Sequence, residues 1–110
     1  MTDQEICTVQ MRDDLGLRDG LSEKRMFGGL CFLLDGNMVC IAGKTAAIYR
    51  VGKHVEPEAL AFPNVVPMAA TGRKMGGIVQ LGYDAFVEDA ETREKLTQMA
   101  LAHAGSLPPK

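Results

Sequence analysis

The chain has 110 residues, of which 46% are hydrophobic and 24% are charged, and its formal net charge is -2. These values are ordinary for one globular domain spanning residues 1–110, and they exclude an intrinsically disordered chain. The longest apolar run, residues 30–34, is far too short to cross a membrane, and Lys and Arg are dispersed along the sequence. We therefore expect no membrane segment, no direct binding to duplex DNA, and a cytoplasmic protein.

The first predicted element is a helix that begins at Thr2 or Asp3 and ends near Gly16. Oxygens of Thr and Asp accept hydrogen bonds from the free N–H groups of a first helical turn, and glycine adopts the left-handed conformation that ends helices. Ile6 and Val9 give this helix only a partial apolar stripe. A connector over residues 18–20 follows.

Four short strands are predicted next, over residues 24–27, 30–34, 38–42 and 47–51. Between the second and third lie Asp35, Gly36 and Asn37, which tolerate the positive φ that a hairpin turn requires. If the loop is Asp35-Gly36, Cys31 lies opposite Cys40. If the loop also includes Asn37, Cys40 lies opposite Phe32, and the sequence leaves both registers open.

Gly28 and Gly29 interrupt the strand pattern. Two adjacent glycines indicate a bulge, a tight corner, or a place where another backbone or a ligand approaches closely. We expect a conformationally demanding corner with positive φ, and such a corner is either purely structural or part of a binding site.

The second half of the chain is predicted to hold a short helix over residues 57–62, an edge strand over 65–68, a turn over 71–73 and a strand over 77–81. Asp89 is expected to cap a final helix, in which Leu96, Met99, Ala100 and His103 fall at i, i+3, i+4 and i+7 and give an apolar stripe with His103 beside it. The predicted fold is α+β with two layers: a largely antiparallel sheet of about five to six strands, with the N- and C-terminal helices packed on one face.

The sequence contains little that points to catalysis. The three cysteines include no C-x-x-C spacing, so neither a disulfide nor a zinc site is expected, and buried small side chains are the simpler interpretation. His54 and His103 have no nucleophile or carboxylate that can be placed near them, and the acidic residues from Asp84 to Glu94 fall in a loop and a helix start. We therefore expect no enzyme, no catalytic residue, no metal and no cofactor.

Three separated blocks of sequence carry a family resemblance. They are residues 25–29 (RMFGG) running into 35–38 (DGNM), residues 71–75 (TGRKM) and residues 106–110 (SLPPK). Together they resemble the N-terminal domain of TfoX/Sxy, bacterial regulators of competence genes, and the resemblance spans about residues 21–110. It implies the same α+β arrangement and a regulatory role, in which full-length members help to activate DNA-uptake genes through contacts with other proteins. Because the resemblance covers only the N-terminal domain, we expect the chain to lack the separate C-terminal helical domain of those regulators.

Two functions follow as hypotheses. The first is a non-catalytic protein-interaction module whose partner is a transcription regulator. The second is a protein that binds a small anion or metabolite, conceivably an unrecognised enzyme, with Arg25, Arg50 and Arg73 near the glycine corner, because guanidinium groups suit carboxylates and phosphates. The candidate binding residues are Arg25, Phe27, Gly28, Gly29, Arg50, Gly72 and Arg73.

A homodimer is also expected. Residues 30–34 place apolar side chains on both faces of the sheet, and helices on one side cannot cover both. The sheet face or edge that the helices leave open would then be buried against a second copy of the chain.

Overall fold

The structure, a computed structural model, describes residues 2–26, 28–70 and 73–110, without the side chains of residues 69, 70 and 73–75. Helices and strands follow one another in the order α1 (Asp3–Leu15), β1 (Leu21–Met26), β2 (Gly29–Leu34), β3 (Asn37–Ala42), β4 (Ala46–Arg50), α2 (Glu56–Leu60), β5 (Val65–Ala70), β6 (Arg73–Gly82), α3 (Tyr83–Glu88) and α4 (Ala90–Ser106).

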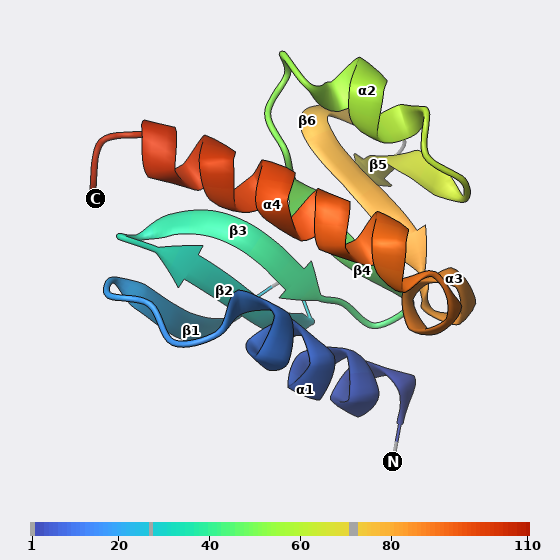
Figure 1. Cartoon of the computed structure of the whole chain (residues 1–110), viewed down its shortest axis with the longest axis horizontal. Helices are drawn as coiled ribbons and strands as arrows, with labels where there is room; N and C mark the ends of the chain where they lie inside the picture. The colour runs from blue at the N-terminus through green and yellow to red at the C-terminus, as the bar shows by residue number, and fades with distance from the viewer. Residues whose placement is uncertain (1, 27, 71–72) are drawn as a thin grey trace.

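The strands form one antiparallel sheet in the order β1-β2-β3-β4-β6-β5. Helix α4 crosses the front of this sheet, with α1 along β3 and α2 beside β6 (Figure 1). The fold is therefore α+β with helices on one face, which confirms the predicted class.

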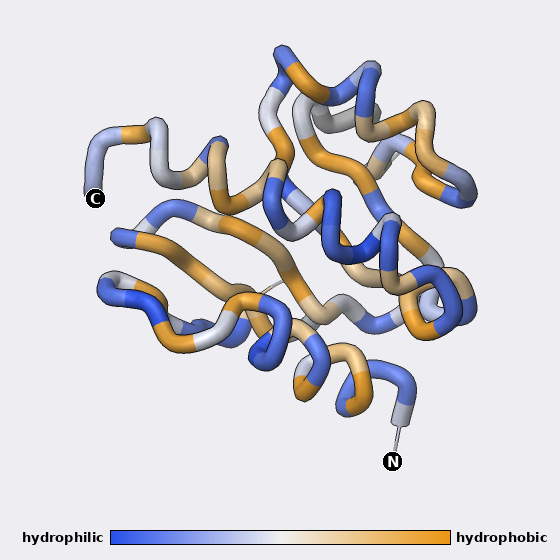
Figure 2. Tube along the Cα trace, viewed as in Figure 1, coloured by the Kyte–Doolittle hydropathy of each residue, from blue (hydrophilic) through white to orange (hydrophobic). Residues whose placement is uncertain are grey.

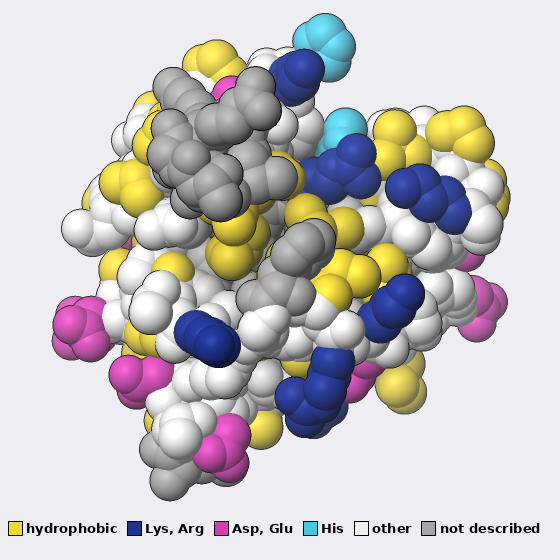
Figure 3. Space-filling view, turned by 180° about the vertical axis from the view of Figure 1, so that it is seen from behind, with side chains coloured by type: hydrophobic (Ala, Val, Ile, Leu, Met, Phe, Trp, Pro, Cys, Tyr) yellow, Lys and Arg dark blue, Asp and Glu magenta, His cyan; other side chains and the backbone are white. Residues whose placement is uncertain are grey.

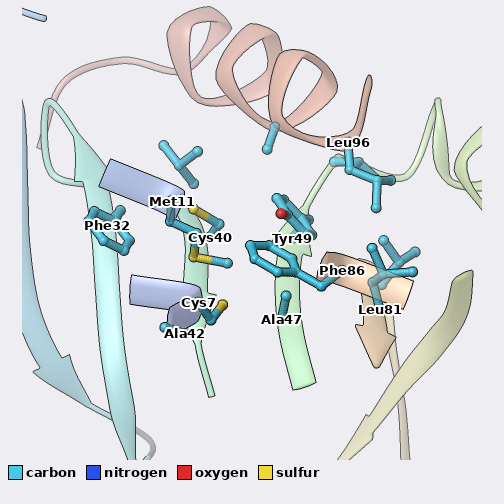
Figure 4. Packing of buried hydrophobic residues seen from close by; sticks show 14 of the residues in the cluster. Cys7, Met11, Phe32, Cys40, Ala42, Ala47, Tyr49, Leu81, Phe86 and Leu96 are labelled. Carbon is cyan, nitrogen blue, oxygen red and sulfur yellow. The ribbon is translucent and has the colours of Figure 1, made fainter. Parts of the chain in front are cut away.

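The core lies between the sheet and the helices. Phe32, Cys40, Tyr49 and Val79 come from four neighbouring strands, pair directly across them, and are at most 1% exposed. Figure 4 shows side chains from α1, α3 and α4 closing over these strand residues. Along the chain, β2 and β3 are hydrophobic over most of their length, whereas β1 is hydrophilic in its middle (Figure 2). The apolar strands thus lie inside the sheet and a charged strand protects its edge.

Helix α1 begins as predicted, with Thr2 accepting a hydrogen bond from the Glu5 N–H. Its predicted stripe is wrong, because Ile6 and Val9 are 37% and 53% exposed. The buried side chains are Cys7, Met11 and Leu15, spaced by four residues. The apolar face of α1 is therefore built from a thiol and a thioether as well as a leucine, residue types that a search for the most hydrophobic positions undervalues.

The β2–β3 hairpin combines features of both registers. Leu34 pairs with Asn37, so the loop is Asp35-Gly36, yet a bulge shifts the pairing farther along and places Cys40 opposite Phe32. Asp35 and Gly36 have φ of 51° and 83°, as the turn requires. Because of the bulge, Cys31 pairs with Ile41 and faces away from the helices.

Several predicted bounds need correction. Strand β1 begins three residues earlier than expected, β6 is twice as long as expected, and α2 starts one residue earlier. Helix α3 was not expected at all, since its acidic residues suggested a loop. It forms because Tyr83 and Phe86 are both buried in the core, and the Tyr83 hydroxyl donates to the Gly43 carbonyl. Asp89 caps α4 as predicted and accepts a hydrogen bond from the Thr92 N–H.

Candidate functional site

The glycine corner is the turn between β1 and β2. Met26 at the end of β1 pairs with Gly29 at the start of β2, so the two strands close at this corner. Gly28 has the expected positive φ, 74°, whereas Gly29 does not. Of the two glycines, Gly28 therefore has the demanding backbone conformation.

The second glycine is required for a different reason. A Cβ on Gly29 would lie 2.3 Å from the carbonyl oxygen of Ala42 on β3. The side-chain amide of Gln4 on α1 donates to that same oxygen at 3.0 Å and to the Gly28 carbonyl at 3.1 Å. The corner therefore packs against the chain's own strand and helix, which supports its structural interpretation.

Arg25 lies on the helix-covered side of the corner, in a groove of about 290 Å³ between α1 and the β1–β2 hairpin. Its neighbour in that groove, Arg12, forms a bidentate ion pair with Glu23 at 2.8 Å. Among the described side chains, the ion pairs involve Arg12, Arg93 and Lys95, so Arg25 belongs to none of them.

Arg50 lies on the opposite face. It pairs with Ile78 on β6 and follows the core residue Tyr49, so its side chain leaves the other side of the sheet. Burial lowers the pKa of His103 on α4 below its ordinary 6.5, with smaller contributions from the charges of Arg50 and His54. The structure does not bring Arg25 and Arg50 together. Phe27, Gly72 and the side chain of Arg73 lie outside the described residues.

The face of the sheet away from the helices is the second candidate, and we refer to it as the open face. A single register row crosses all six strands on it. From β1 to β5 the residues of this row are Lys24, Cys31, Ile41, Ile48, Gln80 and Val66. Cys31 and Ile41 are at most 2% exposed, whereas Val66 is 46% exposed. The row is thus apolar in its centre, with a lysine at one end.

Basic side chains surround this apolar centre (Figure 3). Lys24 and Arg50 stand on the open face itself, and exposed Lys44 and Lys53 lie in the segments at the two ends of β4. Acidic side chains lie toward the margins of the view in Figure 3. Sequence reasoning selected Arg50 but missed the three lysines, because it looked for runs of charge rather than for the distribution of charge along the chain.

That distribution was a usable signal. Seven of the twelve Lys and Arg residues lie between residues 24 and 74, but only three of the fourteen Asp and Glu residues do. This stretch contains the four strands β2 to β5, the short helix α2, the end of β1 and the start of β6. The carboxylates therefore concentrate on α1, α3 and α4, and the cations on the sheet.

The thiols offer no reactive group. All three cysteines are free and buried, as expected from the sequence. Burial raises the pKa of the Cys7 thiol to about 12, and it raises the pKa values of Cys31 and Cys40 as well. In the described part of the chain, no three His, Cys, Asp or Glu side chains are grouped so that they could hold a metal ion. No described helix is long and apolar enough to span a membrane.

Comparison with known proteins gives one match. The family model of the TfoX N-terminal domain matches residues 13–104, which is most of the chain. Neither a curated protein nor a solved structure matches at a significant level.

Proposed function

Because the chain belongs to the TfoX N-terminal domain family, we propose that it is a non-catalytic regulatory module that acts by contacting another protein. The family match over residues 13–104 carries this proposal, since the family suggests a regulatory domain and is not known as enzymatic. The proposed partner is a transcription regulator, the proposed process is the control of competence genes, and the proposed location is the cytoplasm, where such a partner acts.

The chemistry of the described residues agrees with a role in binding. The cysteine thiols are protonated at neutral pH because burial raises their pKa values. The pKa of His103 is lowered by burial and by the charges of Arg50 and His54, and no carboxylate is among the groups that shift it, as one that orients an acid-base histidine would be. These features supply no activated nucleophile and no general base.

The alternative, a small-anion site built by Arg25, Arg50 and Arg73, has no support from the geometry. Arg25 and Arg50 leave opposite faces of the sheet and cannot converge on one anion. A thermal-shift screen against phosphorylated metabolites tests whether the chain binds an anion at some other site. A rise in melting temperature that grows with ligand concentration would favour the alternative.

Affinity purification tests the proposal directly. The tagged chain is recovered from cells of its source organism under native conditions, and copurifying proteins are identified by mass spectrometry. We expect a transcription regulator to be enriched over a control with the tag alone, and to bind the purified chain in isothermal titration calorimetry. A chain that recovers no such protein, and that turns over or binds a metabolite instead, contradicts the proposal.

The homodimer expected from the sequence stays a prediction. Phe32, one of the apolar residues behind it, is fully buried under the helices, and Leu33 on the open face is half-buried within one copy. Light scattering at tens of micromolar distinguishes a dimer from a monomer near 11.9 kDa.

A further inference from the structure

We infer that the open face is a docking surface for an acidic polypeptide segment whose apolar side chains lie between its carboxylates. This inference rests on the proposed function as an interaction module. It adds which surface binds the partner and which charge the partner carries. Three features of the face carry it: an apolar centre, a basic surround, and the position of the cations along β4.

The apolar centre of the open face consists of a buried side chain and of partly exposed side chains around it. Ile41 is almost fully buried, Ile48 and Ile78 are half-buried, and Val66 is 46% exposed at the β5 edge. Leu33 extends the patch toward β1. No helix among the described residues covers these side chains, since α1, α2, α3 and α4 pack on the other face (Figure 1). Contact with apolar groups of a partner would remove this surface from water.

The basic side chains around the apolar centre favour a negatively charged partner. Lys24, Lys44, Arg50 and Lys53 are absent from the ion pairs among the described side chains. No strand residue that faces this side carries a carboxylate, because the nearest one, Glu23, is on the helix side and pairs with Arg12. The cations around the patch are therefore available to a partner's carboxylates.

A second copy of the chain fits this face poorly. In a twofold dimer the same patch meets itself, so Lys24, Arg50 and their neighbours would face the same cations of the other copy. Like charges brought together at an interface oppose association. The outer strands also discourage pairing between sheets, because β1 has three consecutive charged residues and β5 contains Pro67.

Nucleic acid fits less well than a polypeptide. Duplex DNA presents phosphates, whereas the centre of the open face presents isoleucine and valine side chains that phosphates would leave unmatched. The whole chain also carries a net charge of -2. A polypeptide can satisfy both parts of the face, because it can alternate apolar and acidic side chains on one surface.

The cations at the two ends of β4 set a length for the segment. Lys44 lies in the bend before β4 and Arg50 is the last residue of β4, and the five residues of that strand span about 13 Å. A helix would cover that distance with about nine residues. The docking segment is therefore expected to carry carboxylates at both ends of an apolar helical stripe of two to three turns.

Fluorescence anisotropy with designed peptides tests this. The probe is a labelled helical peptide of about 18 residues with leucines on one face and glutamates elsewhere. Two further labelled probes are the same peptide with lysine in place of every glutamate and a duplex DNA of about 20 base pairs. The proteins are the wild type, a double variant Lys24→Glu/Arg50→Glu, the variant Val66→Ser, and the matched control Lys95→Glu on exposed α4. Urea unfolding and circular dichroism confirm that each variant is folded.

We expect the glutamate peptide to bind the wild type with a micromolar dissociation constant that rises with salt. The double variant should weaken it at least tenfold, Val66→Ser should weaken it several-fold, and Lys95→Glu should leave it within about twofold. The lysine peptide and the DNA should not bind. Three results overturn the inference: no saturation with the glutamate peptide up to about 1 mM, equal weakening by Lys95→Glu, or DNA binding that the double variant abolishes.

Light scattering of the same variants adds one more decisive outcome. A wild-type dimer that dissociates in Val66→Ser would put a second copy on the open face and overturn the acidic partner. If the peptide does not bind but affinity purification still recovers a transcription regulator, the docking surface is wrong while the proposed function stands.

Discussion

Replacing Gly29 with alanine should destabilise the protein more than replacing its neighbour Gly28, although only Gly28 has a positive φ. The added Cβ of Gly29→Ala would meet the Ala42 carbonyl oxygen at 2.3 Å, and neither partner is a flexible side chain, so β2 and β3 must separate. Overpacking of this kind costs about 1–3 kcal/mol, and loss of the Gln4 hydrogen bond to the same oxygen adds about 1 kcal/mol. We expect a total of about 2–4 kcal/mol.

Gly28→Ala provides the first comparison. Its Cβ would meet only the flexible end of Lys44, at 2.8 Å, so the cost is chiefly the left-handed backbone, about 1 kcal/mol. Gly105→Ala on α4 is the matched control, because no heavy atom lies within 4 Å of the added carbon. Alanine should stabilise that helix by up to about 1 kcal/mol.

Urea unfolding followed by circular dichroism measures all three variants. The expected order of unfolding midpoints is Gly105→Ala highest, then wild type, then Gly28→Ala, then Gly29→Ala. A midpoint for Gly29→Ala equal to that of the wild type would refute the close contact with Ala42. A larger loss for Gly28→Ala than for Gly29→Ala would show that backbone conformation, rather than packing, dominates at this corner.

Three further outcomes are expected. Arg93→Ala should lower the free energy of unfolding by about 3 kcal/mol, because Arg93 and Asp14 form a 2.9 Å ion pair and their side chains are only 13% and 15% exposed. Arg12→Ala should have a much smaller effect, because the Arg12–Glu23 pair is exposed. The urea midpoints of the two variants test this difference. None of the three buried cysteines should react with a thiol reagent at pH 8 in the folded protein, and all three should react in urea; a fast native reaction would contradict their burial. The pKa of His103 is lowered in the folded state, so as the pH falls the unfolded chain binds the proton of His103 before the folded chain does. The free energy of unfolding should therefore fall as the pH drops below about 6.5, and His103→Gln should make that decline less steep. A His103→Gln variant with the same pH dependence as the wild type would contradict this prediction.

Local sequence determined the elements whose conformation a few neighbouring residues fix. The turn at Asp35-Gly36 needs two positive φ angles, and these residues adopt them at low cost. Asp89 caps α4 because its oxygen reaches the free N–H three residues ahead, wherever the helix packs. The positive φ of Gly28 is likewise a local feature that the sequence predicts. These features, with the alternation of apolar residues, were enough to predict an α+β fold.

Tertiary structure decided what depends on partners far apart in the chain. Asn37 was expected to lie in or beside a turn, yet it is buried because its side-chain amide donates to the Pro108 carbonyl, 71 residues away. Helix α3 exists because Tyr83 and Phe86 reach the core. The bulge in the β2–β3 hairpin sets which face Cys31 joins, and no local rule fixes a bulge position.

In the candidate site, too, the sequence determined some features and the tertiary structure determined others. The sequence identified Arg25 and Arg50 by residue type, but their separation onto opposite faces follows from strand register, which pairs Arg25 with Leu30 and Arg50 with Ile78. The sequence alone carries the uneven distribution of charge, with cations in the strands and carboxylates in the helices. Only the packing of the described helices against one face of the sheet turns that distribution into a basic surface, because it takes the carboxylates of those helices to the side away from Lys24 and Arg50.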